Sequence, residues 1–295
     1  MNVAELNGSL GEAWRLACQR IERQDAKLLL QHASGATHAE LIAHPERALS
    51  AKQGDRFAKL VSRRASGEPL AYLLGSAYFC GLEFVVSPSV LIPRPDTEIL
   101  VEQAVKRVQA WHQAPTQVAA RSGDRLRIVD LGTGSGIVAI MLARRCPSVE
   151  LTAVDVSVAA LDVARANADR HGVQIRFLEG DWYVPLGDER FDLIVSNPPY
   201  VAAGDAHLQG NGLPFEPFDA LSDGVAGSDG MACIRTLVEG AWAHLLPGGW
   251  LLIEHGYDQA VQTRTLLLQA GFDTVSSWRD GAAIERVSGG CRSPD

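Results

Sequence analysis

The sequence predicts an α/β protein in which a doubly wound, seven-stranded, mostly parallel sheet follows a small helical domain and a β-hairpin. Three observations predict this fold. The first ~75 residues have helical periodicity and little strand character. Period-two, β-rich character then appears around Gly81. From Asp96 onward, short apolar segments alternate with helical ones, which is typical of parallel strands joined by crossover helices.

The helical domain is expected to span residues 1–75. Apolar residues fall on one helical face in "LGEAWRLACQRI" (10–21), and "DAKLLLQHASG" (25–35) ends at a glycine, a common helix stop. Another helix is expected within residues 51–75, ending at Gly67. Together these segments predict a small helical bundle.

Residues 76–95 are expected to form a β-hairpin linker, and residues 96–295 the sheet domain. The sheet domain begins with a helix, capped by Asp96 or Thr97, that runs to about Trp111. A polar loop follows at 112–124. Strands are expected at 125–132, 150–156, 175–180, 191–197, 249–256, 274–280 and 283–289, with helices at 137–146, 158–172 and 230–246. The C-terminal "GGCRSPD" is expected to be a frayed tail.

The composition is that of an ordinary soluble globular protein, with 46% hydrophobic and 21% charged residues. The apolar runs are too short for a membrane-spanning helix, and the N-terminus lacks the pattern of a secretion signal. The five cysteines are scattered, with no CxxC pair and no histidine cluster at ligand spacing. We therefore expect a cytoplasmic protein without a membrane anchor, a disulfide framework or a metal site.

Charge is unevenly divided along the chain. Residues 1–95 hold 11 Lys and Arg against 9 Asp and Glu, a balance of +2, whereas the remainder holds 16 against 26, a balance of −10. An acidic sheet domain repels a phosphate backbone, so direct nucleic-acid binding is not expected. Nothing in the sequence indicates an obligate oligomer, and we expect a monomer.

A glycine-rich loop follows the first strand of the sheet domain and opens a helix. Its residues are Gly132, Thr133, Gly134, Ser135 and Gly136. Glycines let the backbone turn sharply and let a ligand approach it closely. A dinucleotide fingerprint would need a further glycine where Ile137 stands. The loop is therefore a candidate cofactor site of another kind, with a turn that binds nothing as the alternative.

The next two strand ends carry further candidate ligands. Asp155 follows one strand, where a carboxylate can accept hydrogen bonds from ribose hydroxyls. Asp181 and Trp182 follow the other, where they could hydrogen-bond to and stack on an adenine ring. Asp155 as a helix cap and Trp182 as core packing are the alternatives. Together the three strand ends favour adenosine binding without pyrophosphate.

The fourth strand end carries Asn197, Pro198, Pro199 and Tyr200. A planar nitrogen needs acceptors for its N–H groups if its lone pair is to turn toward a reactive carbon. The Asn197 side-chain oxygen and the Pro198 carbonyl are such acceptors, and the prolines fix their direction. Tyr200 offers a face for a flat substrate group. A structural β-turn is the alternative.

The strand ends resemble those of class I S-adenosylmethionine-dependent methyltransferases, and NPPY resembles the (D/N)PP(Y/F) motif of amino-methyltransferases. The wider set "FVVSPSVLIPRPDTEILVEQA", "DLGTGSG", "AVDVS", "GDW", "SNPPYV", "FEPFDALSDGVAGSDG" and "IEHGYDQ" is similar to the HemK/PrmC family over nearly the whole chain. The resemblance implies the class I methyltransferase fold and transfer of a methyl group from S-adenosylmethionine to N5 of the glutamine in the GGQ motif of peptide-chain release factors.

The resemblance also implies residue roles. Gly132–Gly136, Asp155, Trp182 and Asn197 would bind the cofactor, and Asn197–Tyr200 would hold the glutamine amide, with Asn197 and Pro198 catalytic. "PRPDTE" (93–98) would form a pocket wall, although a helix cap explains Asp96 and Thr97 equally well. "FEPFDALSDG" (215–224) is expected near the mouth of the site, and its Glu216 is either substrate-facing or a surface charge.

Other functions stay open at this point. An adenine-N6 methyltransferase acting on DNA or RNA would share NPPY, and a sister enzyme would methylate a glutamine of a ribosomal protein. A non-catalytic cofactor-binding protein is a third alternative. The helical domain is expected to dock a second part of the release factor.

Overall fold

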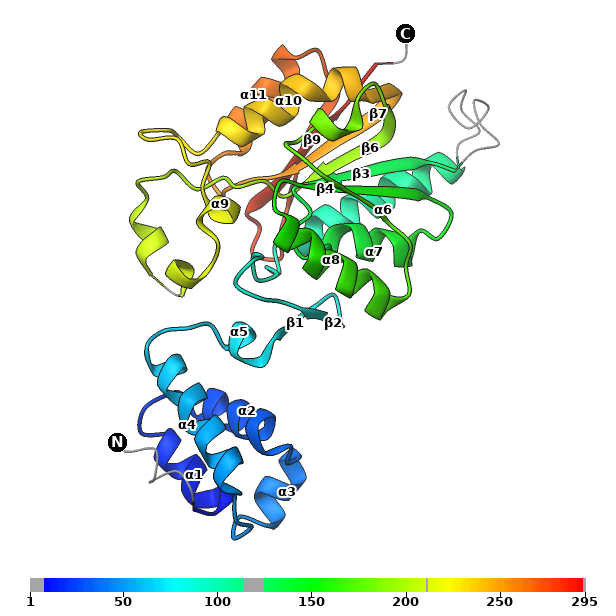
Figure 1. The fold of residues 1–295 in the computed structure, drawn as a ribbon. Coiled ribbons are helices and arrows are strands. Elements are labelled where there is room, and N and C mark those ends of the chain that lie inside the picture. Colours follow the sequence, from blue (N-terminus) through cyan, green and yellow to red (C-terminus); the bar gives the residue numbers. More distant parts are fainter. Residues whose placement is uncertain (1–7, 114–124, 211, 294–295) are drawn as a thin grey trace. The chain divides into compact units, whose positions relative to one another are not determined.

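The computed structural model of the protein describes residues 8–113, 125–210 and 212–293 (Figure 1). They form two compact units. The helical unit lies within Met1–Ser76 and Asn211–Phe215, and the sheet unit lies within Ala77–Gly210 and Glu216–Asp295. Most of the polar loop predicted at 112–124 falls outside the described residues.

The helical unit has a core in which Leu29, Phe57 and Val61 are fully buried. Its helices are α1 (Leu10–Ala17), α2 (Arg23–Ser34), α3 (His38–Ala43), α4 (Ala51–Ala65) and α5 (Leu70–Leu74), with a 3₁₀ turn at Leu213–Phe215. As predicted, α2 stops at Gly35, whose φ of 72° suits glycine. The sequence did not predict α3 or α5.

The predicted hairpin around Gly81 is present. Strands β1 (Ser76–Phe79) and β2 (Leu82–Val85) are joined by Cys80 and Gly81, which both have positive φ, as two-residue hairpin turns require. The Val85 amide donates to Oδ1 of Asn167 (2.7 Å), and Nδ2 of Asn167 donates back to the Val85 carbonyl (3.0 Å). These two bonds fix the hairpin to helix α8 (Val158–His171) of the sheet unit.

The sheet unit has the predicted doubly wound architecture. Its seven strands run in the order β5-β4-β3-β6-β7-β9-β8, all parallel except β9. The strands are β3 (Arg127–Leu131), β4 (Glu150–Asp155), β5 (Arg176–Glu179), β6 (Phe191–Ser196), β7 (Leu245–Glu254), β8 (Asp273–Arg279) and β9 (Glu285–Cys291). The helices are α6 (Thr97–Gln113), α7 (Ile137–Arg145), α8 (Val158–His171), α9 (Phe218–Leu221), α10 (Ala232–His244) and α11 (Ala260–Gln269), with 3₁₀ turns at Val184–Leu186 and Ala206–Gln209.

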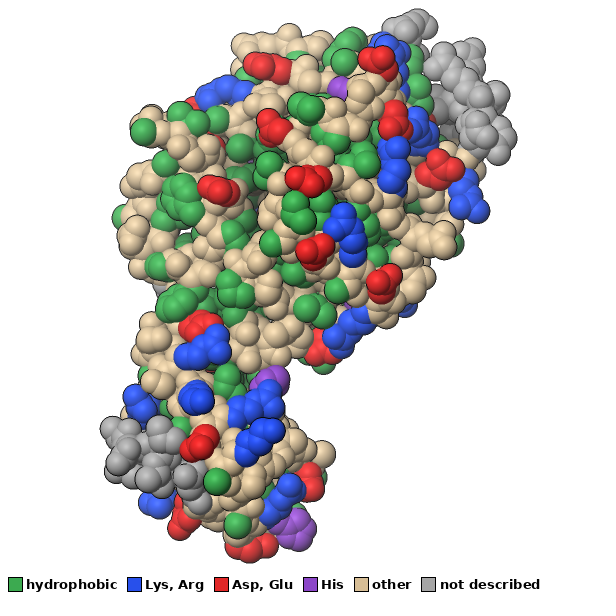
Figure 2. All heavy atoms as spheres, viewed as in Figure 1, with side chains coloured by type: hydrophobic (Ala, Val, Ile, Leu, Met, Phe, Trp, Pro, Cys, Tyr) green, Lys and Arg blue, Asp and Glu red, His purple; other side chains and the backbone are tan. Residues whose placement is uncertain are grey.

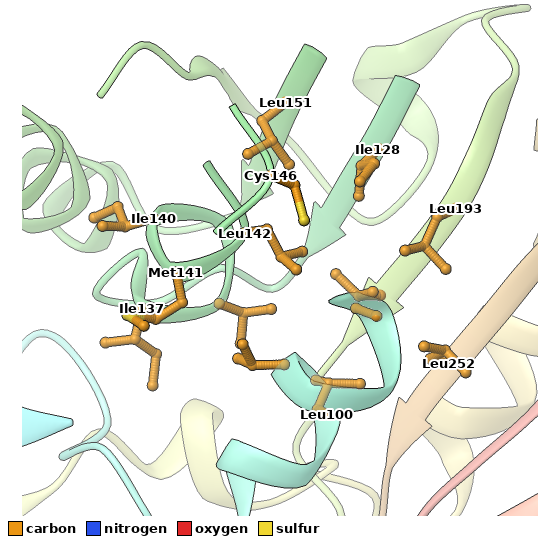
Figure 3. Packing of buried hydrophobic residues seen from close by; sticks show 14 of the residues in the cluster. Leu100, Ile128, Ile137, Ile140, Met141, Leu142, Cys146, Leu151, Leu193 and Leu252 are labelled. Carbon is orange, nitrogen blue, oxygen red and sulfur yellow. The ribbon is translucent and has the colours of Figure 1, made fainter. Parts of the chain in front are cut away.

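Strand side chains alternate between two cores, one on each face of the sheet. Ile128, Leu193 and Leu252 pack with residues of α6 and α7 on one face, as Figure 3 shows. Val129, Ile194 and Leu251 face the other way and pack with α10 and α11. Two covered faces hold the parallel strands rigidly, so side chains at their carboxyl ends share one edge of the sheet.

Two features at the C-terminal end differ from the prediction. Helix α11 was not predicted, because its apolar residues do not follow one clear face. The frayed tail predicted from Gly289 is wrong up to Cys291, since β9 extends to that residue. No helix of the described residues is long and apolar enough to cross a membrane.

Candidate active site

A cavity of about 250 Å³ opens where β3, β4 and β6 end in the sheet unit. Nine of the predicted site residues line it: Gly132, Thr133, Gly134, Ser135, Asp155, Asp181, Trp182, Asn197 and Pro199. Gly136, Pro198 and Tyr200 are not among the lining residues. The fold therefore brings residues from four separate strand ends around a single space.

The glycine loop is shaped by close contacts. At Gly132, with φ of 71°, a Cβ would lie 3.4 Å from the Trp182 ring. At Gly136, with φ of 82°, a Cβ would lie 3.1 Å from Cβ of Ala164 in α8. The positive φ favours glycine at both positions, and Gly136 also lacks the space for a Cβ. Gly136 acts one layer behind the cavity, by letting α7 and α8 pack closely.

Asp155 accepts hydrogen bonds from the glycine loop and from the residue that caps the following helix. Its Oδ2 accepts from the Gly134 amide at 2.8 Å, and its Oδ1 accepts from the Ser157 amide at 2.9 Å. Ser157 is the residue that caps α8, through the Ala160 amide, so the helix-cap alternative for Asp155 is wrong. Burial raises the pKa of Asp155, although both backbone bonds oppose that rise.

Trp182 both lines the cavity and packs against the core of the sheet unit. Its indole lies against the cavity and is also packed against the core that contains Val154 and Leu186. Asp181, beside it, is exposed and lines the cavity. An aromatic wall and a carboxylate therefore stand together at the end of β5.

Asp130 also lines the cavity, although the sequence predicted no role for it. Its side chain is 1% exposed and lines the cavity. Oδ2 accepts from the Thr133 hydroxyl at 2.7 Å and from the Ala139 amide at 3.3 Å. Burial raises the pKa of Asp130 to about 7. The sequence feature that could have indicated this role is an acidic residue in an otherwise apolar strand, just before the glycine loop.

The charge of the lining residues tests which cofactor fits. Four carboxylates line the cavity: Asp130, Asp155, Asp181 and Asp219. The single lining cation among the described residues, Arg94, is paired with Glu216 at 2.5 Å. Such a lining repels a pyrophosphate and favours a cationic ligand. A nucleoside joined to a sulfonium and an ammonium group fits these residues.

The sequence left Glu216 as either a substrate-facing residue or a surface charge, and the structure shows neither. It is 7% exposed, and besides its ion pair with Arg94 it accepts a hydrogen bond from the Ile92 amide at 3.0 Å. These contacts hold the segment before α9 against the "PRPDTE" segment, in which Pro93, Arg94 and Thr97 line the cavity. Glu216 therefore fixes a wall of the site instead of standing free on the surface.

The NPPY segment is held at both ends. Nδ2 of Asn197 donates to Oγ1 of Thr97, the first residue of α6, at 3.0 Å. At the other end, the Tyr200 carbonyl accepts from Nε2 of Gln259 at 3.0 Å. The Tyr200 hydroxyl reaches Oε1 of Glu254 at 3.5 Å. With Nδ2 of Asn197 engaged, its Oδ1 is the acceptor left for a ligand.

Comparisons with known proteins agree with this architecture. The Methyltransferase small domain family matches residues 116–210, and the PrmC N-terminal domain family matches residues 14–75. A crystal structure of a methyltransferase from Pyrococcus furiosus superposes with a TM-score of 0.52 at 18% identity, covering 80% of this chain and 99% of that one. The sheet unit thus has the class I methyltransferase fold.

The sequence relatives are more specific. The release factor glutamine methyltransferase of Bordetella pertussis (strain Tohama I) is 47% identical over 276 residues, covering 93% of this chain and 97% of its own. That of Xylella fastidiosa (strain Temecula1) is 46% identical over 275 residues, covering 93% and 94%. This chain belongs to the release factor glutamine methyltransferase family.

The raised pKa of Asp130 predicts a pH-dependent stability. The folded protein keeps the Asp130 proton up to about pH 7, whereas the unfolded chain loses it near pH 4. The free energy of unfolding should therefore fall as pH rises from about 4 to about 7. Asp130→Asn should remove a part of this fall on the order of a few kcal/mol, measured by chemical denaturation across this pH range. The exposed-carboxylate control Asp162→Asn should behave like wild type, and an unchanged pH profile in Asp130→Asn would contradict the assignment.

Proposed function

We propose that this protein transfers a methyl group from S-adenosylmethionine to the side-chain amide nitrogen (N5) of the glutamine in the GGQ motif of peptide-chain release factors. The proposal is supported by relatives of 46–47% identity that carry this name across nearly their whole length. The structural observation that carries it is the Asn197 amide, which lines the cavity with its Nδ2 already bonded to Thr97.

Methylation of the glutamine side chain requires the protein to orient a planar amide. The glutamine N–H groups donate to Oδ1 of Asn197 and to the Pro198 carbonyl, which turns the nitrogen lone pair toward the methyl group. Pro198 and Pro199 fix the backbone that carries both acceptors. The reaction would form an N–CH₃ bond, break the S–CH₃ bond of the sulfonium to leave S-adenosylhomocysteine, and release one proton from the nitrogen. Catalysis is mainly positioning, because the sulfonium of the cofactor supplies an activated methyl group.

The cofactor roles follow the geometry of the cavity. Asp155 is proposed to accept from the ribose hydroxyls with the lone pairs that its two backbone bonds leave free. Asp181 and Trp182 are proposed to contact the adenine, and the backbone of Gly132–Ser135 to form the floor of the cavity, with Gly136 packed behind it. Asp130 lines the same cavity, and a bound cation would favour its ionised form.

Substrate and setting complete the proposal. The protein is proposed to act as a cytoplasmic monomer on a protein substrate, without binding nucleic acid directly. Figure 2 shows acidic and basic side chains interspersed on the visible face of the sheet unit, which suits a protein partner better than a phosphate backbone. The domains are proposed to be residues 1–75, 76–95 and 96–295, the first docking a second part of the release factor.

The docking proposal can be tested on α4. Its solvent face exposes Lys52, Arg56 and Lys59, and Figure 2 shows basic side chains on this unit. A double variant, Lys52→Glu with Lys59→Glu, should raise KM for intact release factor several-fold and leave KM for a short GGQ peptide unchanged. The control Lys106→Glu changes an exposed lysine of the sheet unit and should alter neither. An unchanged KM for the intact factor in the double variant would remove the docking role.

Asn197→Ala should retain the fold and much of the cofactor affinity but lose turnover by on the order of 10²-fold or more, because it removes a positioned acceptor. Single-turnover methyl transfer and calorimetric cofactor binding measure the two effects separately. A kcat close to wild type would exclude Asn197 from the mechanism.

Asp155→Ala should weaken cofactor binding by about 1.5–3 kcal/mol if its hydrogen bonds to the ribose are charge-assisted. Titration calorimetry measures the change, and a thermal melt checks that the loop held by Asp155 remains folded. An unchanged Kd would leave Asp155 with only its contacts to the Gly134 and Ser157 amides.

The function itself is tested with labelled S-adenosylmethionine and purified release factor, beside a GGQ→GGA variant of that factor. Nucleic acid and ribosomal protein are run in parallel. Label on the wild-type factor that disappears with the glutamine establishes both the reaction and its site. Label only on nucleic acid or only on ribosomal protein would overturn the proposed substrate.

A further inference from the structure

A buried carboxylate that the proposed mechanism does not use lies behind the NPPY segment. Glu254 is the last residue of β7, and its side chain is 0% exposed. Its neighbour Ile253 pairs with Ser196 of β6, so Glu254 and Asn197 are adjacent where the two parallel strands end. Glu254 is not among the residues that line the cavity.

Thr97 links this carboxylate to the site. Its side chain is 1% exposed, and its Oγ1 accepts from Nδ2 of Asn197 at 3.0 Å. The same hydroxyl also interacts with the Glu254 carboxylate and lowers the pKa of that carboxyl, which is the effect of a donated hydrogen bond. A hydroxyl has one hydrogen, and an ionised carboxylate can only accept. Thr97 therefore donates to Glu254, and its lone pair is left for Asn197.

This order of donors decides which way the Asn197 amide faces. With Nδ2 held by the lone pair of Thr97, Oδ1 is the group left to accept from a ligand. If Thr97 instead donated to Asn197, the amide would turn over and present N–H groups to a substrate that also offers N–H groups. A carboxylate behind Thr97 prevents that arrangement.

We propose that Glu254 is a positioning residue that acts through Thr97 to keep the Asn197 side-chain oxygen directed at the substrate amide nitrogen. The inference rests on the proposed function, since it assigns a direction to the acceptor that function requires. Glu254 does not contact the substrate; it selects one of the two orientations that an asparagine amide can adopt.

The surroundings of Glu254 argue against a purely structural role. Oε1 is reached by the Tyr200 hydroxyl at 3.5 Å, and Oε2 is buried without a hydrogen-bond partner in the described part of the chain. The nearby cation, Arg286, is paired with Asp96 (3.1 Å) and Asp280 (2.9 Å). A carboxylate buried this way is costly, and such groups cluster at functional sites.

The charge state of Glu254 gives the inference a pH signature. Burial raises its pKa to about 7, with Asp96 adding to the rise and Arg286 opposing it. Tyr200 and Arg286, which face it from the ends of β6 and β9, have pKa values raised further above neutrality. Glu254 accepts from Thr97 as a carboxylate only above its pKa. The orientation of Asn197 should therefore become fixed as pH rises through about 7.

The test compares Glu254→Gln, Thr97→Val and the double variant. Glutamine replaces a carboxylate, which only accepts, by an amide that can also donate, and valine removes the hydroxyl. Both substitutions nearly preserve the side-chain volume, so neither leaves a large cavity. Each single variant should lower kcat about 10-fold or more, the loss expected for a hydrogen bond to a charged group. Glu254→Gln should leave the cofactor Kd unchanged, because Glu254 does not line the cavity. The double variant should be no slower than the slower single variant, because the two residues act as one chain. Thr97→Ser should restore activity. Glu239→Gln, an exposed carboxylate on α10, should match wild type.

A measurement without turnover separates this inference from the proposed function. The side-chain amide resonance of Asn197 should shift with a midpoint near pH 7 in wild type and lose that titration in Glu254→Gln. A flat resonance in wild type, losses that multiply in the double variant, or an effect on cofactor Kd instead of kcat would each overturn the positioning role. Absence of methyl transfer by wild type, with the titration intact, would overturn the proposed function and leave the Glu254–Thr97–Asn197 chain standing.

Discussion

The hydrogen bond from Nδ2 of Asn197 to Oγ1 of Thr97 is the contact on which the site depends. It joins the end of β6 to the start of α6 and leaves the Asn197 oxygen as the free acceptor. The NPPY segment is further fixed by Gln259, which binds the Tyr200 carbonyl. The hydrogen-bond acceptor for the substrate amide, Oδ1 of Asn197, is thereby held in place by Thr97 and Gln259. Little reorganisation is needed when a substrate amide binds.

The same edge of the sheet explains why acidic side chains collect there. Parallel strands end together, so Asp130 in β3, Asp155 at the end of β4 and Asp181 after β5 line one cavity. Burial raises the pKa of Asp130 and of Asp155. Ionisation of these carboxyl groups therefore lowers the stability of the folded protein. A cationic cofactor offsets that cost on binding. Stability and cofactor affinity are linked through these carboxylates.

The sequence predicted the features that depend on neighbouring residues, and missed those that join distant ones. The glycine loop, the hairpin turn at Gly81 and the strand ends are local patterns. The hydrogen-bonded pair Thr97 and Asn197 is separated by 100 positions in the sequence. The pair Arg94 and Glu216 is separated by 122 positions. No local sequence pattern predicts either contact. The end of the C-terminal strand β9, which runs to Cys291, was predicted two residues too early for another reason. Glycine disfavours strands, yet a Cβ on Gly289 would lie 2.4 Å from the Leu251 carbonyl oxygen, so close strand packing requires glycine there.

The central claim is that Asn197 accepts from the nitrogen that is methylated. A crystal structure of the protein with S-adenosylhomocysteine and a peptide containing Gly-Gly-Gln would test it most directly. The account predicts the glutamine side-chain nitrogen within hydrogen-bond distance of both Oδ1 of Asn197 and the Pro198 carbonyl, with Nδ2 still bonded to Thr97. A glutamine bound with its carbonyl oxygen toward Nδ2 of Asn197, or bound away from Asn197 altogether, would contradict it.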